Sequence, residues 1–120
     1  MNFDALRKFC TTLRGATVDI KWGADECHCV GGRMFAVFLL ARGRGATVSF
    51  KCEPSRFLEL TDVPGIVPAP YLARAHWVQV TATGALTDAQ ARELVARSHA
   101  LVFAKLTRRE RDAIAATTKS

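Results

Sequence analysis

Arginine and lysine side chains form the clearest chemical pattern in this sequence. In Arg42-Gly43-Arg44-Gly45 two guanidinium groups alternate with glycines, which is typical of a tight turn between two strands. Because a guanidinium pairs with phosphate oxygens through a planar fork of donors, such a turn can follow the phosphates of a nucleic acid. Trp77 would then offer a flat ring on which an unpaired base stacks. Other basic residues would extend this positive strip: Lys21, Arg33, Lys51 and Arg74.

Positive charge is concentrated in two segments of the chain. Of the 120 residues, 17 are Lys or Arg and 11 are Asp or Glu, which makes the net charge +6. Residues 33–56 carry five basic side chains and one acidic, and residues 97–120 carry six basic and two acidic. Segregated charge of this size favours a polyanionic partner, although a basic surface also serves solubility alone.

Arg108 and Arg109 belong to the same pattern. They stand in the first turn of an expected C-terminal helix, where the helix dipole disfavours cations. A phosphate partner would explain them, and a solvated helix end is the alternative. The alternative for Arg42 and Arg44 is that they solubilise a loop, with Trp77 packed beneath a neighbouring proline-rich segment.

Tyr71, His76 and Trp77 define a second candidate site, for a small molecule. The imidazole of His76 can exchange a proton near neutral pH, so an acid–base role is conceivable. The sequence contains no glycine-rich phosphate loop, nucleophile elbow or informative pair of carboxylates. We therefore assign no catalytic residue and expect a non-enzymatic protein without a cofactor. The structural alternative is that His76 hydrogen-bonds to a backbone carbonyl and fixes a loop.

Cys27-His28-Cys29 raises the question of a metal site. On a strand the two thiols point to one side and the imidazole to the other, and no second pair of ligands has the usual spacing. Core packing of small hydrophobic thiols is the preferred interpretation. We expect no metal and four free cysteines.

Hydrophobic periodicity predicts the elements that position these residues. Helical spacing indicates helices over residues 3–14, 55–60, 88–106 and 108–117, and alternation indicates strands over residues 17–22, 27–30, 33–40, 47–52 and 77–81. Prolines hold residues 63–71 extended. The result is a two-layer α+β sandwich, an antiparallel sheet of about five strands with helices on one face. Residues 1–120 form a single domain that frays from about residue 117.

Alternation also predicts the two faces of the sheet. Six apolar residues are expected to face the helices: Val18, Ile20, Val48, Phe50, Val78 and Val80. The opposite face is then polar and open except for Trp77, and the strand over residues 33–40 is apolar on both sides. The proline segment or a second subunit would cover it. In the second case Phe38 and Leu40 would anchor a protein-interaction or dimerisation module.

Several of these motifs occur together in a known family. Over residues 6–111 the sequence resembles the MmcQ/YjbR family, most specifically in Ser49-Phe50-Lys51 with Pro54, followed by Ala75-His76-Trp77-Val78. The other matching elements are Lys21-Trp22-Gly23, Phe35, Tyr71, Ser98-His99, Leu101-Val102 and Lys105-Leu106. The resemblance implies a CyaY-like, double-wing α+β domain that is described as DNA-binding. The chain departs from the family pattern at His99, where tyrosine is commoner.

These patterns together predict a cytoplasmic protein that binds DNA without sequence preference, through hairpin arginines and an open sheet face. The longest apolar run, residues 34–41, is far shorter than the ~20 residues of a membrane-spanning helix. The N-terminus lacks the basic and then apolar pattern of a secretory signal. A homodimerisation module and a small-molecule site remain the alternatives.

Overall fold

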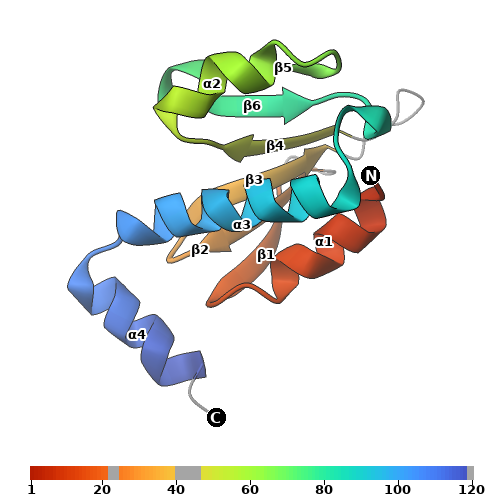
Figure 1. Ribbon diagram of the computed structural model, residues 1–120. Coiled ribbons are helices and arrows are strands. Elements are labelled where there is room, and N and C mark those ends of the chain that lie inside the picture. The colour runs from red at the N-terminus through yellow and green to blue at the C-terminus, as the bar shows by residue number, and fades with distance from the viewer. Residues whose placement is uncertain (22–24, 40–46, 119–120) are drawn as a thin grey trace.

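The computed structural model describes residues 1–21, 25–39 and 47–118. The helices are α1 (Phe3–Thr11), α2 (Pro54–Thr61), α3 (Asp88–Ala104) and α4 (Arg108–Thr118), with short 3-10 turns η1 (Ala73–Ala75) and η2 (Thr83–Ala85). The strands are β1 (Ala16–Lys21), β2 (Asp25–Val30), β3 (Arg33–Leu39), β4 (Thr47–Lys51), β5 (Ile66–Pro68) and β6 (Trp77–Val80). They form one antiparallel sheet in the order β1-β2-β3-β4-β6-β5, and α1, α2 and α3 lie on one face of it (Figure 1). The predicted two-layer α+β sandwich is confirmed.

The sheet has one strand more than the sequence predicts. Part of the extended proline segment, Ile66–Pro68, pairs with β6 and becomes the edge strand β5. An edge position tolerates Pro68 because one side of an edge strand needs no N–H donors. Since β5 is only three residues long, its alternation is too short to read from sequence.

Local sequence signals set the helix ends. The side chain of Asn2 accepts from the backbone N–H of Ala5, and Thr87 and Gln90 form a capping box at the start of α3. Two helices end earlier than predicted, α1 at Thr11 and α3 at Ala104, while α2 and α4 each run one residue further, to Thr61 and Thr118.

The helix-facing side of the sheet forms the main core. Val48, Phe50, Val78 and Val80 are fully buried there, as predicted. Val18 and Ile20 are expected in the same layer but are 45% and 57% exposed, because β1 is the edge strand and the helix layer does not cover them.

Phe38 also lies in the helix-facing core. Its ring is fully buried and packs edge-on against Phe3 of α1. The expectation that Phe38 anchors a partner on the open face is therefore wrong. The second proposed anchor, Leu40, lies outside the described residues, as does Trp22.

A bulge in β3 joins α3 to the sheet. The pairing with β2 shifts between His28 and Cys29, so that Phe35 is an extra residue on β3. The hydroxyl of Ser98 donates to the Phe35 carbonyl at 2.7 Å and accepts from the Lys51 backbone N–H at 2.9 Å. One fully buried hydroxyl on α3 therefore connects β3 and β4.

The last helix packs on two glycine turns. Gly15 and Gly31 both have positive φ, and a Cβ atom built on them would lie 2.5 Å from Ile114 and 2.7 Å from Leu106, respectively. These contacts hold the junction of α3 and α4 against the ends of β1 and β2. No helix within the described ranges is long and apolar enough to cross a membrane.

Candidate nucleic-acid interface

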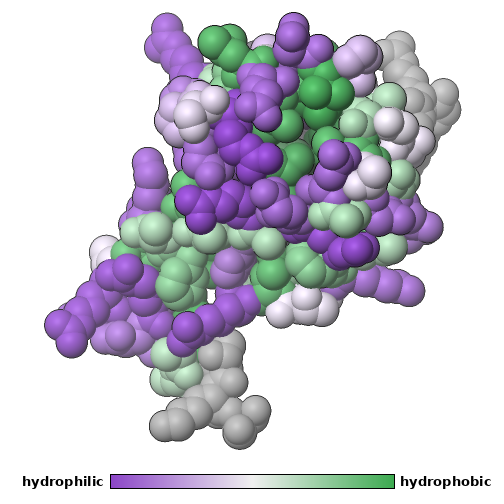
Figure 2. Space-filling model, viewed as in Figure 1, coloured by the Kyte–Doolittle hydropathy of each residue, from purple (hydrophilic) through white to green (hydrophobic). Residues whose placement is uncertain are grey.

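Cations from distant parts of the sequence meet where α3 passes into α4. We call the group Arg33, Lys51, Lys105, Arg108 and Arg109 the basic end. β3 begins, β4 ends and α4 starts at this end of the sheet (Figure 1). Hydrophilic side chains gather there on the surface (Figure 2).

Two pairs of charged residues lie near one another at the basic end, where Gly31, Gly32 and Glu110 also line one hollow. Burial lowers the pKa of Lys51, and the charge of Lys105 lowers it further. Hydrogen bonds from Thr107 lower the pKa of Glu110, and the charge of Arg33 adds to this effect. Lys51 of β4 is therefore near Lys105 at the end of α3, and Arg33 of β3 is near Glu110 of α4, two pairings that no local sequence pattern indicates.

Lys51 stabilises the fold through hydrogen bonds in addition to contributing positive charge. Its Nζ donates to the Ala75 carbonyl at 2.6 Å, and its backbone N–H is bound by Ser98. Because this ammonium already has a carbonyl partner, Lys51 stabilises the η1 segment beside the basic end. It is less available to phosphates than the sequence predicts.

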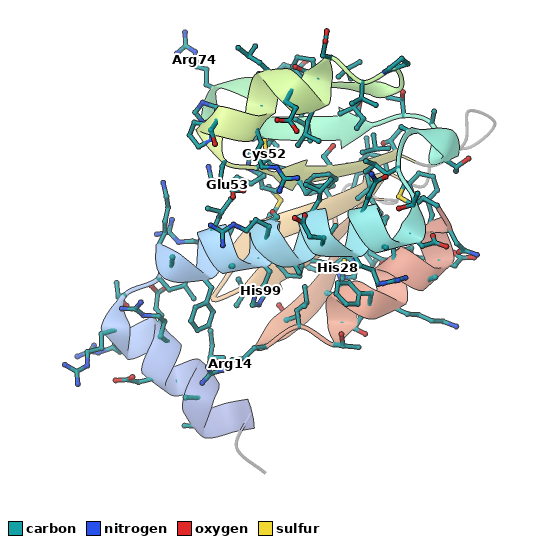
Figure 3. All side chains as sticks on the ribbon, viewed as in Figure 1. Arg14, His28, Cys52, Glu53, Arg74 and His99 are labelled. Carbon is teal, nitrogen blue, oxygen red and sulfur yellow. The ribbon has the colours of Figure 1, made fainter. Side chains whose placement is uncertain are left out.

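Arg74, Arg108 and Arg109 are freely accessible. All three are exposed, but Arg74 projects beside β6, on the other side of the molecule from the start of α4, so the structure does not bring it to the basic end (Figure 3). Arg108 is 91% exposed and lies 3.9 Å from Asp112, a distance at which an exposed pair is weak. The reciprocal hydrogen bonds of Thr107 and Glu110 cap α4, and the Glu110 carboxylate offsets the unfavourable placement of two cations at a helix start.

The structure does not test the predicted hairpin arginines. Arg42 and Arg44 fall within residues 40–46, outside the described residues. The strand ends that flank this segment, Leu39 and Thr47, pair with each other at the opposite end of β3 from Arg33. Seven strand residues separate these ends by about 20 Å. Arg33 therefore lies at the other end of β3 from the described strand ends Leu39 and Thr47.

Trp77 does not present an open ring. It is 6% exposed and packs on the far face of the sheet with Ala69, Leu72 and Val37. This is the alternative in which Trp77 packs under the proline segment. The ring that the sequence proposes as a stacking plane is therefore covered in this conformation.

His76 fixes the chain through its backbone. The residue has a left-handed conformation with φ of 63°, and its carbonyl accepts from the Cys52 N–H at 2.9 Å. Its ring packs edge-on against Phe57, with centroids 5.6 Å apart. The predicted loop-fixing role is thus performed by the carbonyl of His76 rather than by its imidazole.

A pocket of about 410 Å³ opens on the far face of the sheet, beside the proline segment. Its walls are largely apolar and include Met34, Val37 and Leu72, and its polar groups come from Asp25, Ser49 and Gln79. Tyr71 stands at its rim, with φ of 66° and a side chain that is fully exposed. Of the three residues proposed for a small-molecule site, Tyr71 alone lines this pocket.

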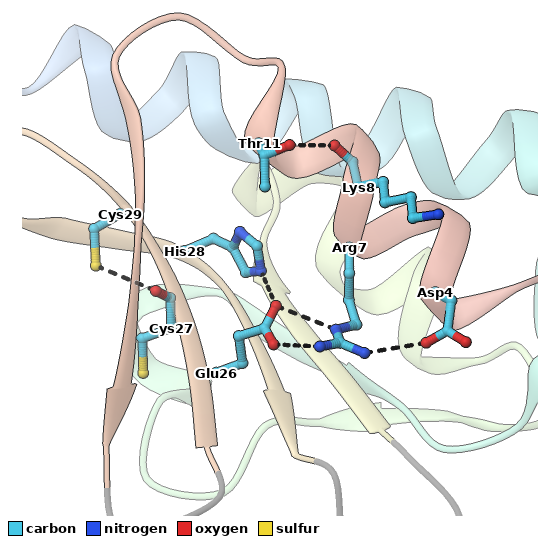
Figure 4. A network of polar contacts seen from close by, with 8 residues as sticks. All are labelled: Asp4, Arg7, Lys8, Thr11, Glu26, Cys27, His28 and Cys29. Carbon is cyan, nitrogen blue, oxygen red and sulfur yellow. Dashed lines mark hydrogen bonds and ion pairs between the residues drawn. The ribbon is translucent and has the colours of Figure 1, made fainter.

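An ion network beneath α1 is the main feature that sequence reasoning missed. Arg7 donates to both carboxylate oxygens of Glu26, at 2.6 and 3.2 Å, and Glu26 lies 2.7 Å from His28 Nε2 (Figure 4). The sequence signal that could have revealed it is a Glu and a His two positions apart on one strand. Side chains at such positions lie on the same face, which here is the face that packs against the helices. Cys27 and Cys29 face the other way, as predicted.

The cysteines behave as core residues. All four are buried, and burial raises the pKa of the Cys10 thiol to about 12. A thiol with so high a pKa is a poor nucleophile and a poor metal ligand at neutral pH. Within the described part of the chain, no three His, Cys, Asp or Glu side chains gather as metal ligands would.

The antiparallel sheet with helices on one face defines a small α+β domain, and exposed cations gather at one end of it. The family model YjbR matches residues 11–101, and the chain belongs to the YjbR family. A comparison with curated proteins finds no match.

Two solved structures share the fold. The Deinococcus radiodurans protein DR2400, which has a DUF419 domain, superposes with a TM-score of 0.81 at 28% identity, covering 93% of this chain and 86% of that one. A Pseudomonas syringae protein superposes with a TM-score of 0.70 at 20% identity, covering 85% of this chain and 99% of that one. The second likeness concerns the fold alone.

Proposed function

We propose that this protein binds nucleic acid through its basic end, by phosphate contacts that carry no sequence preference. The observation that supports this most directly is that the start of β3, with Arg33, lies beside the first turn of α4, which carries Arg108 and Arg109. Arg108 and Arg109 are exposed, so their guanidinium groups can reach a phosphate backbone without rearrangement of the core.

The proposal includes DNA as the partner, a cytoplasmic location and no catalytic step. Each cation that replaces a condensed counterion contributes to affinity through ion release, and this contribution is independent of base sequence. A double-wing mode of binding would add contacts from residues 40–46, which carry Arg42 and Arg44.

The test is fluorescence anisotropy of a short labelled duplex, titrated at salt concentrations from about 50 to 200 mM. Replacing Arg108 and Arg109 with Gln should weaken binding and reduce the slope of log affinity against log salt by about two, since each phosphate contact contributes about 0.9. The matched control replaces Lys8 and Arg92, which are exposed and lie outside the basic end. Absence of binding at low salt, or an equal loss in the control, contradicts the proposal.

Self-association is a second candidate, supported by the apolar edge strand. Val18 and Ile20 project from β1 with 45% and 57% of their surfaces exposed, and an edge strand can pair with another copy. The substitution Ile20→Lys should convert a dimer into a monomer in light scattering. A wild-type protein that is monomeric at high concentration contradicts this candidate.

A further inference from the structure

We infer that the pocket on the far face of the sheet binds one unpaired nucleobase beneath the ring of Tyr71. We call it the far-face pocket, and its polar groups are those of Asp25, Ser49 and Gln79. The inference rests on the proposed nucleic-acid function and specifies a single-stranded region as the ligand.

The shape of the far-face pocket suits a flat ring. One wall is the sheet, through Val37 and Met34, and the other is the proline segment, which Leu72 and Ala69 hold against the sheet. The volume of about 410 Å³ lies within the range of small-molecule sites. Apolar walls on two sides can contact both faces of a base.

Tyr71 combines a strained backbone with a fully exposed ring, which is unusual for an aromatic residue. Its φ of 66° is a left-handed conformation that side-chain-bearing residues rarely adopt, and its side chain is fully exposed. Neighbouring backbone hydrogen bonds, Leu72 N–H to Ala69 and Trp77 N–H to Leu72, hold the segment in place. Strain retained beside a pocket indicates a ligand role, since the ring gains no burial in the free protein.

The polar groups of the far-face pocket match the edge of a base. Ser49 and Gln79 are directly paired across β4 and β6, so both project to the same face of the sheet. A glutamine amide can donate to and accept from a base edge at the same time. Ser49 is only 6% exposed, so a largely apolar wall contains a buried hydroxyl beside the Gln79 amide.

Asp25 determines which bases the far-face pocket prefers. A carboxylate accepts hydrogen bonds from exocyclic amino groups and repels phosphates. We therefore expect adenine and cytosine to bind better than thymine, with the phosphates outside the pocket. Arg74 is exposed three residues after Tyr71 in the same segment, which Lys51 ties to the basic end through Ala75. A strand whose base occupies the pocket can thus continue towards the basic end.

The first experiment uses nucleosides, because they carry no phosphate and do not depend on the basic end. Isotope-labelled protein titrated with adenosine or cytidine should show NMR shift changes at Ser49, Gln79 and Tyr71, with smaller changes for thymidine. Shift changes confined to other surfaces, or none at all at millimolar nucleoside, overturn the inference.

The second experiment compares single-stranded oligonucleotides with duplex. Replacing Tyr71 with Ala should weaken binding of an adenine-rich single strand about tenfold, since one stacked base is lost, and should leave duplex binding unchanged. Tyr71→Phe should retain the affinity, and the control Leu58→Ala, which removes another exposed apolar side chain elsewhere, should also retain it.

The outcomes separate the two proposals. If Tyr71→Ala and Gln79→Leu both bind single strands as the wild type does, while duplex binding still depends on Arg108 and Arg109, the base pocket is wrong and the proposed function stands. If no polynucleotide binds but nucleosides shift the pocket residues, the pocket accepts free nucleosides and the proposed function fails.

Discussion

His28 Nε2 lies 2.7 Å from Glu26 Oε1, and both side chains are buried between β2 and α1. The second ring nitrogen, Nδ1, has no hydrogen-bond partner among the described residues. A neutral imidazole that donates from Nε2 leaves only an acceptor unpaired. Protonation would instead bury an N–H donor and a second charge, which explains why burial lowers the pKa of His28.

This pair predicts a loss of stability in acid. The pKa of His28 in the folded protein is below its ordinary 6.5, so its contribution is complete above that pH and is lost as the pH falls through the folded value. Hydrogen bonds from Arg7 likewise lower the pKa of Glu26, whose contribution is lost further into acid, below 4.5. Urea denaturation should give a smaller free energy of unfolding at pH 5 than at pH 7.5.

The substitution His28→Leu tests how much the imidazole contributes to this pH dependence of stability. It removes the titrating group but keeps an apolar side chain of similar size, so the difference in stability between the two pH values should shrink. An unchanged difference would mean that other groups cause the acid sensitivity.

Ser98→Ala should destabilise the fold by about 1–3 kcal/mol. The change leaves the carbonyl of Phe35 and the N–H of Lys51 buried without their shared partner. Urea denaturation measures the loss, and Ser55→Ala at an exposed position is the control, expected to stay within about 0.5 kcal/mol. Equal effects at the two serines would refute the bridging role.

Alanine substitutions at three glycines can distinguish the stability cost of backbone strain from that of steric contact. At Gly15 an alanine would have both an unfavourable positive φ and a Cβ 2.5 Å from Ile114, at Gly32 only the positive φ, and at Gly84 neither. We expect Gly84→Ala to be nearly neutral and Gly32→Ala to cost about 1 kcal/mol. Gly15→Ala should cost more than Gly32→Ala in thermal unfolding, because α4 must move away. Similar values for Gly15→Ala and Gly32→Ala would mean that Ile114 adapts freely.

Tyr71→Gly should stabilise the protein by up to about 1 kcal/mol, because glycine adopts positive φ without strain and the exposed ring loses no packing. Tyr71→Ala, which removes the ring but keeps the strain, should change stability little. Differential scanning calorimetry compares the two. A lower melting temperature for Tyr71→Gly would indicate that the ring contributes to the free fold.

Patterns between near neighbours in the sequence determined the elements and the layers of this protein. The alternation around Val48 and Phe50 indicated a strand and its buried face, and the spacing of Thr87 and Gln90 indicated the start of α3. These features depend on residues only a few positions apart, so they can be predicted from a single sequence.

Contacts between distant segments decided the candidate sites. Burial of Trp77 depends on a proline segment that folds back over the sheet, and the meeting of Arg33 with Glu110 depends on packing of α4 against the turns at Gly15 and Gly31. The register of β3 similarly separates Arg33 from the strand ends that flank residues 40–46. Periodicity describes which side of an element is apolar, but register, bulges and helix docking set which charges and rings become neighbours, and these are properties of the packed chain alone.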